Sequence, residues 1–334
     1  MKSISVIIPC YNCESTIVEA IESILCSALL PAEIVLIDDC STDSTPELMS
    51  DLLNKYHHLV VFGQTDYNCG PARTRNLGAK MASGEYLFFM DSDTQILPDA
   101  LANFMECIEK YDAVVGMYDQ KPINSGASPQ YKALLYEYLL GCEEIYEYDQ
   151  FSASCAGIRS NIFWELGGFD ERFPPGLDFE NEEFGHRISK RHKIVLNSKI
   201  RVRHHFPYFK KMTRTFFQRT ALWVEMFLLR RKFSNRAGTR KTGLTSLALL
   251  FSVAFLPLAP LKPLGYLPSL ITYLIYLYGY IGFFRFVQTQ RPEFLPKSII
   301  LNHYYTLIIS SGAIYGLSKA IKGNSQILKR FSPT

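Results

Sequence analysis

The fold is decided by the stretch Gly84-Glu85-Tyr86-Leu87-Phe88-Phe89-Met90-Asp91-Ser92-Asp93-Thr94. A short apolar run, bounded by a glycine and a turn, predicts a strand buried on both faces. Because ligands bind at the carboxyl ends of strands in open parallel sheets, we expect Asp91 and Asp93 at the floor of a site. An Asp-x-Asp turn can offer oxygens to one hard cation, which commonly holds a diphosphate. The plainer interpretation is a turn that caps the helix near Pro98.

Strand and helix patterns alternate along the first 110 residues. Predicted strands lie at 5–9, 33–37, 59–62 and 85–90, and predicted helices at 14–27, 45–55, 71–83 and 98–110. This alternation is typical of an α/β protein, with a mostly parallel sheet flanked by helices on both faces.

Three of the four predicted strands end in polar turns, at Tyr11-Asn12, Asp38-Asp39 and Asp91–Asp93, which should meet at one sheet edge. The sequence has no G-x-G-x-x-G after its first strand and no G-x-x-x-x-G-K-[ST], so dinucleotide and P-loop sites are excluded. Carboxylates accept hydrogen bonds from base N–H groups and ribose hydroxyls. Asp39 could therefore bind a base, and Asp91 a ribose or a metal.

Four motifs follow one another in these segments: V-I-I-P-x-Y-N at 6–12, I-D-D-x-S-T-D at 37–43, G-x-x-x-x-R-N-x-G at 70–78, and G-E-Y at 84–86 leading to D-x-D at 91–93. In order and spacing they resemble glycosyltransferase family 2. The resemblance implies a GT-A fold, a nucleotide-sugar donor, a Mg²⁺ or Mn²⁺ ion, and inversion at the anomeric carbon by a single displacement. It assigns nucleotide-sugar binding to Pro9, Tyr11, Asn12, Asp38, Asp39, Arg75, Asn76, Asp91 and Ser92.

The resemblance continues at residues 167–171, which are similar to the segment that precedes the family's acceptor site. Residues 178–188 resemble the Glu-Asp motif on the helix that carries the catalytic base, but Asn181 stands where the family usually has Asp. The candidate bases are Glu180, Asp178 and Glu182, with Glu180 first because it occupies the motif's own Glu. Closely spaced acids raise one another's pKa, which suits a general base. Alternatively, they form an acidic first helical turn favoured by the helix dipole.

Residues 200–205 predict a strand that ends in two histidines. Family members often place a His after this strand, near the metal and the diphosphate. The resemblance therefore implies that the metal ligands are Asp91, Asp93, His204 and His205.

The cysteines indicate no metal centre of their own. Cys10 and Cys13 form a C-x-x-C, but no second pair is spaced to complete a zinc site. We therefore expect reduced, cytosolic thiols. The chain enters its first strand without a signal-peptide pattern.

The composition changes near residue 242. Residues 201–241 hold twelve Lys and Arg against one acid, which suits nucleic acid or an anionic membrane surface. The uncharged runs that follow favour the membrane, so we expect membrane lipids and no nucleic acid as partners. Runs 243–261 and 263–284 are near the ~20 residues needed to cross a bilayer, and they predict a transmembrane hairpin. A third run, 298–318, could span or lie at the interface.

The expected organisation has four parts: a GT-A catalytic domain at 1–212 (nucleotide-sugar half 1–110, acceptor half 111–212), a basic juxtamembrane helix at 213–242, a transmembrane hairpin with a third apolar helix at 243–322, and a polar tail at 323–334. The basic stretch predicts a cytoplasmic catalytic domain. We expect transfer from a UDP-sugar, the default donor of the family, to a lipid-linked or saccharide acceptor in cell-surface glycan synthesis.

Two alternatives remain open at this point. A processive polysaccharide synthase is disfavoured because the chain lacks correctly spaced Gln-x-x-Arg-Trp and N-terminal spans. A catalytically inactive nucleotide-sugar-binding protein is supported by Asn181, and it is opposed by the intact acids Asp39, Asp91 and Asp93.

Overall fold

The structure is a computed structural model that describes residues 3–141, 143–173, 179–230, 240–258, 260 and 264–325. The chain divides into two compact units. The first comprises Met1–Asn124 and Leu140–His205, and the second comprises Ser125–Leu139 and Phe206–Thr334.

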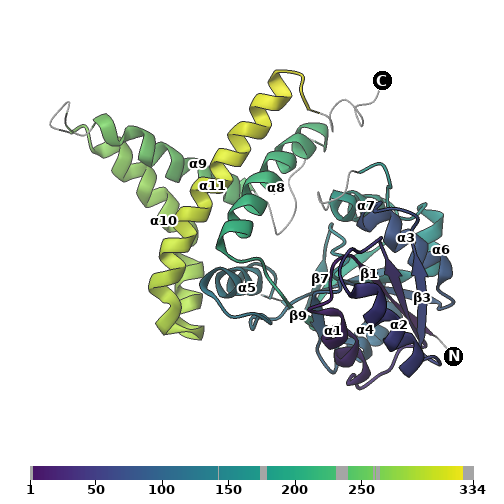
Figure 1. The fold of residues 1–334 in the computed structure, drawn as a ribbon. Helices are drawn as coiled ribbons and strands as arrows, with labels where there is room; N and C mark the ends of the chain where they lie inside the picture. The colour runs from purple at the N-terminus through teal and green to yellow at the C-terminus, as the bar shows by residue number, and fades with distance from the viewer. Residues whose placement is uncertain are drawn as a thin grey trace. The chain divides into compact units, whose positions relative to one another are not determined.

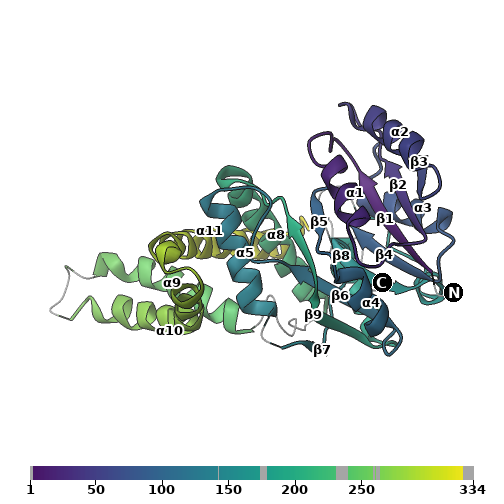
Figure 2. The ribbon, with the colours of Figure 1, turned by 90° about the horizontal axis from the view of Figure 1, so that it is seen from below.

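The first unit is built on one mixed sheet (Figure 1). Its strands are β1 (Ile4–Cys10), β2 (Glu33–Asp38), β3 (Val60–Gln64), β4 (Tyr86–Met90), β5 (Thr94–Ile96), β6 (Ala113–Tyr118), β7 (Ile145–Glu147), β8 (Cys155–Arg159) and β9 (Ile194–His204). The order is β3-β2-β1-β4-β8-β6-β9-β5, with β7 paired to β9. Figure 2 shows β1, β2 and β3 side by side. The predicted parallel sheet is confirmed for β1 to β4, whereas β8 runs antiparallel to β4.

Helices cover both faces of this sheet, as an α/β fold requires. They are α1 (Ile17–Leu25), α2 (Thr45–Lys55), α3 (Pro71–Met81), α4 (Ala100–Ile108), α6 (Ser160–Glu165) and α7 (Phe179–Ser189). Every residue of β4 is fully buried, as the apolar run predicts. Phe88 packs edge-on against Phe104 of α4, and Phe89 packs against Phe163 of α6. Since neighbouring residues of a strand face opposite ways, the two contacts show that both faces are covered.

Small residues in β8 allow α4 to approach the sheet closely. A Cβ atom on Gly157 would overlap the ring of Phe104. Phe104 also packs against Tyr86 of β4. A larger residue at position 157 would therefore push α4 away from β4. The small residue at position 157 therefore serves the packing of α4 on the sheet.

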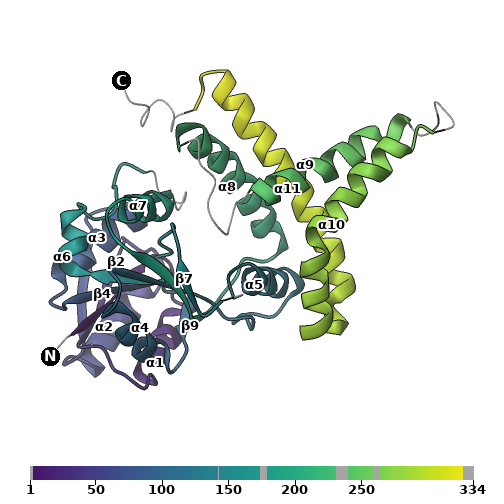
Figure 3. The same cartoon turned by 180° about the vertical axis from the view of Figure 1, so that it is seen from behind.

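The second unit is helical. It contains most of α5 (Ala127–Leu140), together with α8 (Phe209–Arg230), α9 (Arg240–Phe255), α10 (Leu267–Gln290) and α11 (Leu295–Ile321), and the short 3₁₀ turns η1 (Leu256–Leu258) and η2 (Pro292–Phe294). Figure 3 shows α8 beside α11 and α9 beside α10. Two glycines one turn apart bring α11 onto α8, because Cβ atoms on Gly312 and Gly316 would meet the carbonyl oxygens of Phe217 and Ala221. Small residues of this kind permit close helix packing in membranes.

A buried polar network ties three of these helices together. The Asn302 side chain on α11 donates to the Tyr131 hydroxyl on α5 (3.0 Å) and accepts from the Tyr276 hydroxyl on α10 (2.5 Å). The Tyr305 hydroxyl of α11 donates to Ser128 of α5 (2.7 Å). Because a buried polar group is costly without a partner, these bonds fix how α5, α10 and α11 pack.

Two helices of the described chain are long and apolar enough to cross a membrane, Lys241–Leu258 and Leu267–Gln290, each with a mean hydropathy of 1.5. Only 28% of the apolar part of the first helix and 17% of that of the second is buried, so most of their apolar surface faces outward. They are therefore consistent with membrane association. The third predicted run lies in α11, which packs along α8.

Gly316→Leu is expected to destabilise the second unit by about 1–3 kcal/mol or more, because the side chain has no room between α11 and α8. Gly243→Leu on α9 is the matched control, since nothing lies within 4 Å of a Cβ atom there. Thermal unfolding of the purified protein in detergent would measure both. Equal melting temperatures for the two variants would contradict the close contact between the helices.

Candidate functional site

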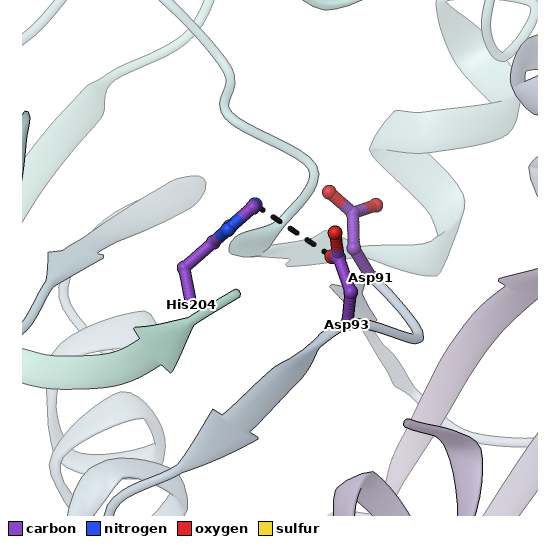
Figure 4. Close-up of side chains that lie close together, drawn as sticks. All are labelled: Asp91, Asp93 and His204. Carbon is purple, nitrogen blue, oxygen red and sulfur yellow. Dashed lines mark ion pairs between the residues drawn. The ribbon is translucent and has the colours of Figure 1, made fainter. Parts of the chain in front are cut away.

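Two carboxylates and an imidazole converge beyond the end of β4 (Figure 4). Asp91 and Asp93 come from the turn after β4, and His204 is the last residue of β9. One ligand atom from each lies within 4.8 Å of the others, and His204 Nε2 is 3.6 Å from Asp93 Oδ1. The ring of Tyr118 packs perpendicular to the imidazole of His204, with ring centroids 4.9 Å apart, which restricts the orientation of the imidazole.

Strand pairing explains why His204 lies here. Thr94 of β5 pairs antiparallel with His204, so the turn that carries Asp93 is held against the end of β9. The other predicted histidine plays a different part in this structure. The His205 N–H group donates to the carbonyl oxygen of Asp93 (2.9 Å), and its side chain is not part of the three-residue cluster.

The cluster fits a hard or borderline divalent cation. Loss of solvent contact raises the pKa of Asp93; His204 opposes this shift and the Asp91 carboxylate adds to it. A cation between the two carboxylates would relieve their repulsion. Carboxylate oxygens suit Mg²⁺ and Mn²⁺, and an imidazole nitrogen is a common ligand for the later transition metals. Both ions named from the sequence are therefore compatible with the cluster.

Arg75 of α3 joins the cluster to α7. One of its amino groups donates to Asp91 Oδ1 (2.8 Å) and the other donates to Glu180 Oε1 (2.9 Å). Only 4% of the Arg75 side chain and 3% of the Glu180 side chain are exposed. The guanidinium carbon also lies 5.7 Å from the ring centroid of Phe169. Two charge-assisted bonds and an aromatic contact hold this arginine in one place.

The first turn of α7 is acidic. Glu180 and Glu182 are both buried, and Asp178 lies outside the described residues. The amide oxygen of Asn181 is also buried and has no hydrogen-bond partner within the described chain. Glu183 forms an ion pair with Arg187 (2.7 Å) within the helix.

Asn12 links the loops that follow β1 and β2. Its side-chain oxygen accepts from the Thr42 N–H group (2.8 Å), and its own N–H group donates to the Ser41 hydroxyl (2.9 Å). The residue has a φ of 49°, a left-handed conformation that Asn tolerates better than most residues. Tyr11 beside it is exposed, whereas Pro9 on β1 is partly buried. Ser92, in the turn between the two aspartates, is also partly buried.

The two aspartates after β2 hold neighbouring segments of the chain. Asp38 is fully buried and accepts from the Gln64 side chain (3.1 Å) and from the Ser41 N–H group (3.2 Å). Asp39 accepts from the Thr65 hydroxyl (2.8 Å) and from the N–H groups of Cys69 (2.9 Å) and Gly70 (2.8 Å). Burial acts to raise the pKa of Asp39, but these hydrogen bonds outweigh it and the pKa is lowered. Asp39 thus anchors the loop before α3.

Asn76 holds the segment before α7. Its amide donates to the carbonyl oxygen of Phe169 (2.8 Å) and to Glu171 (2.9 Å), and its oxygen accepts from the Phe169 N–H group (2.9 Å). The Asn76 side chain therefore holds the backbone of Phe169, whose ring contacts the Arg75 guanidinium. The structure thus brings Asp91, Asp93, His204, Arg75 and Glu180 into one connected group. The contact of Arg75 with Glu180 has no local sequence signal, because it joins positions 105 residues apart.

Asp39→Asn is expected to destabilise the first unit by about 1–3 kcal/mol at pH 7, because three donors lose a charged acceptor. The folded pKa lies below the unfolded value of about 3.9. The ionised form therefore adds stability that is complete above about pH 5 and is lost as the pH falls through the folded pKa. Melting temperatures of the wild type and the variant should differ at pH 7 and converge as the pH falls through the folded pKa, whereas exposed Asp51→Asn should behave as the wild type throughout. A difference independent of pH would contradict this account.

Comparison with known proteins extends these observations. Residues 5–167 match the family model for Glycosyl transferase family 2. The chain is 34% identical over 130 residues to the poly(ribitol-phosphate) beta-glucosyltransferase of Bacillus spizizenii, a match covering 38% of this chain and 20% of the relative. It is 32% identical over 146 residues to the Escherichia coli protein named UDP-Glc:alpha-D-GlcNAc-diphosphoundecaprenol beta-1,3-glucosyltransferase WfaP, covering 39% and 57%. The chain thus spans between 20% and 57% of the length of these two relatives.

Solved structures share the fold. Mannosyltransferase PcManGT from Pyrobaculum calidifontis, in complex with GDP-Man and Mn²⁺, matches with a TM-score of 0.58 at 16% identity, covering 97% of this chain and 88% of that chain. Residues 1–349 of S. aureus TarS in complex with UDP-GlcNAc match with a TM-score of 0.51 at 19% identity, covering 97% and 93%. At this identity the likeness concerns the fold alone. Residues 5–167 of this chain therefore form a glycosyltransferase family 2 domain, in an α/β fold of the GT-A type.

Proposed function

We propose that this protein is a membrane-associated glycosyltransferase that moves a sugar from a nucleoside-diphosphate sugar to an acceptor used in cell-surface glycan synthesis. The observation that carries the proposal is the cluster of Asp91, Asp93 and His204 at the end of β4, inside a family 2 domain. A carboxylate-rich strand end suits a cation-bound diphosphate better than a free one, because carboxylates repel phosphate oxygens.

The proposed donor is a UDP-sugar. The name of the WfaP relative specifies UDP-glucose, and the TarS structure contains UDP-GlcNAc. The PcManGT structure contains GDP-Man, so the fold also accommodates a purine nucleotide. In the proposed complex, Tyr11 and Asn12 lie at the base and ribose end of the donor, and Asp91 and Ser92 lie toward its diphosphate.

Asp91, Asp93 and His204 are proposed to hold Mg²⁺ or Mn²⁺, which when bound neutralises charge that develops on the departing diphosphate. In an inverting displacement, the acceptor oxygen bonds to the anomeric carbon as the bond from that carbon to the diphosphate oxygen breaks. The acceptor proton passes to a carboxylate on α7. Glu180 is already held in the ion pair with Arg75, so Glu182 is the described acid on α7 that we propose as the proton acceptor.

The proposed acceptor is a hydroxyl group of a lipid-linked saccharide. The WfaP relative is named for a diphosphoundecaprenol acceptor, and α9 and α10 could hold the enzyme at the membrane that contains such a lipid. Residues 201–241, with twelve Lys and Arg, support a position at the cytoplasmic face. An inactive nucleotide-sugar-binding protein is favoured by one observation, the amide at position 181 of α7. The buried acids on either side of it support catalysis.

The test is a donor screen with full-length protein in detergent. Released nucleoside diphosphate would be measured with UDP-sugars and GDP-mannose, with Mn²⁺ and with lipid-diphosphate-linked saccharides as acceptors. We expect acceptor-stimulated release with one UDP-sugar, and release at least about 10²–10³-fold slower with Asp93→Asn. Wild-type protein that binds nucleotide sugars but turns over none with any of these acceptors would favour the inactive alternative.

Glu182→Gln is expected to lower turnover by about 10²–10⁴-fold with a sugar-hydroxyl acceptor, because the hydroxyl must lose a proton as it attacks. The same variant should lose little with a polyprenyl phosphate acceptor, which is already anionic near neutral pH. Glu183→Gln is the control, since Glu183 pairs with Arg187 on the same helix. Full turnover of Glu182→Gln on a hydroxyl acceptor would remove Glu182 as the base.

A further inference from the structure

Arg75 poses an electrostatic problem for the proposed cation site. Its guanidinium lies 2.8 Å from Asp91 Oδ1, an oxygen of a residue proposed to bind a divalent cation. A buried positive charge at this distance from a ligand disfavours a second positive charge there, and the effect is large where water is excluded. A cation site beside an uncompensated arginine would therefore be weak.

Glu180 supplies the missing charge. Its Oε1 atom lies 2.9 Å from the other amino group of Arg75, and both side chains are almost fully buried. The pair carries no net charge, so Asp91 and Asp93 retain two negative charges for a divalent cation. The same pairing directs one amino group of the guanidinium toward α7 and only the other toward Asp91.

The surrounding packing keeps Glu180 in this position. Phe169, which contacts the Arg75 guanidinium, also packs on Phe184 of α7, with ring centroids 4.8 Å apart. Asn76, the residue next to Arg75 on α3, binds both backbone groups of Phe169. α3, the segment around Phe169 and α7 therefore form one packed support for the pair.

We propose that Glu180 is a positioning residue that neutralises Arg75 and thereby keeps Asp91 available to a divalent cation. This inference rests on the proposed function, which supplies the cation, and it gives Glu180 a role other than proton acceptor. Without Glu180, Asp91 is the ion-pair partner that remains to Arg75 among the contacts described above, and cation binding must compete with that ion pair. Two elements distant in the sequence, α3 and α7, would thus set the affinity of a site at the end of β4.

The test is Mn²⁺ binding to full-length protein in detergent without donor, followed by the electron paramagnetic resonance signal of free Mn²⁺. We expect Glu180→Gln to weaken binding by at least about tenfold, the effect of one unbalanced charge several ångströms from a divalent cation even at a dielectric near that of water. Glu183→Gln, on the same helix but paired with Arg187, should bind as the wild type does. In an Arg75→Met background, Glu180→Gln should have little further effect, because the charge that it balances is gone.

Several results would overturn the inference. Glu180→Gln that binds Mn²⁺ like the wild type but loses turnover would make Glu180 a proton acceptor only. Equal weakening by Glu180→Gln and Glu183→Gln would indicate a general disturbance of α7. Absence of Mn²⁺ binding by the wild type would instead overturn the proposed metal site itself. The comparison of the two single Glu variants does not depend on Arg75→Met folding, and their melting temperatures would confirm that both fold.

Discussion

Asp93→Asn is expected to abolish Mn²⁺ binding and to lower sugar transfer by at least about 10²–10³-fold, the range for losing one preorganised contact to developing charge. Asp93 contributes an oxygen to the cluster and lies 3.6 Å from His204. An amide is neutral and is a poorer ligand for a hard cation, so the cluster would retain only one of its two carboxylates.

Released nucleoside diphosphate and free Mn²⁺ would measure the two effects of Asp93→Asn in the same preparation. Asp99→Asn is the matched control, because Asp99 is an exposed carboxylate at the start of α4 whose side chain makes no capping hydrogen bond. Wild-type transfer that continues in excess chelator would show that the cluster acts without a cation, and the metal assignment would then be wrong.

Arg75→Met is expected to destabilise the first unit by about 3–5 kcal/mol, the cost of removing one partner from a buried ion pair. Both Asp91 and Glu180 lose their ion pair with Arg75, and Glu180 has almost no access to water. For a domain of this size, that loss corresponds to a fall in melting temperature of roughly 10 °C. Arg75→Met/Glu180→Gln should recover much of the loss, because the second change removes the uncompensated buried charge.

Arg172→Met is the control for Arg75→Met. Arg172 pairs with Asp170 at 2.6 Å, but 60% of its side chain is exposed. Exposed pairs of this kind contribute about 0–1 kcal/mol, so this variant should melt close to the wild type. Comparable losses for both arginines, or no recovery in the double variant, would contradict the view that burial makes the Arg75 bridge important.

The two predictions address different properties of one site. Asp93 is proposed to act on the ligand directly, so its replacement should leave the fold intact. Arg75 is buried between two acids, so its replacement should affect folding and function together. Melting temperature and Mn²⁺ binding, measured on the same samples, separate these outcomes. The Asp93 variant should lose Mn²⁺ binding alone, whereas the Arg75 variant should change both quantities.

Local patterns in the sequence predicted the elements of the first unit well. The run 86–90 predicts a buried strand, and β4 occupies those residues with every side chain buried. The helical period at 45–55 is confirmed by α2, and the two carboxylates follow directly after β4. These features depend on neighbouring residues and on short motifs, so the chain need not be folded for them to be recognised.

In the C-terminal part, composition predicted helices but not their partners. The apolar runs coincide broadly with α9, α10 and α11. α9 ends at Phe255, shortly before Pro257, because proline interrupts helical hydrogen bonding. Whether the third run spans or lies at the interface remained open in the sequence, and the structure adds that it packs along α8 through Gly312 and Gly316.

Residue patterns predict the strands and helices of the first unit, the acids at the end of β4 and the family resemblance. Which groups meet follows from the folded chain: His204 lies by Asp93 because β5 pairs with β9, and Arg75 reaches Glu180 because α3 and α7 pack around Phe169. It also decided that Ser125–Leu139 belongs with the C-terminal helices. The physical reason is that hydrophobic periodicity reports only which face of an element is buried. Pairing between distant segments depends on strand register and side-chain packing across the whole core.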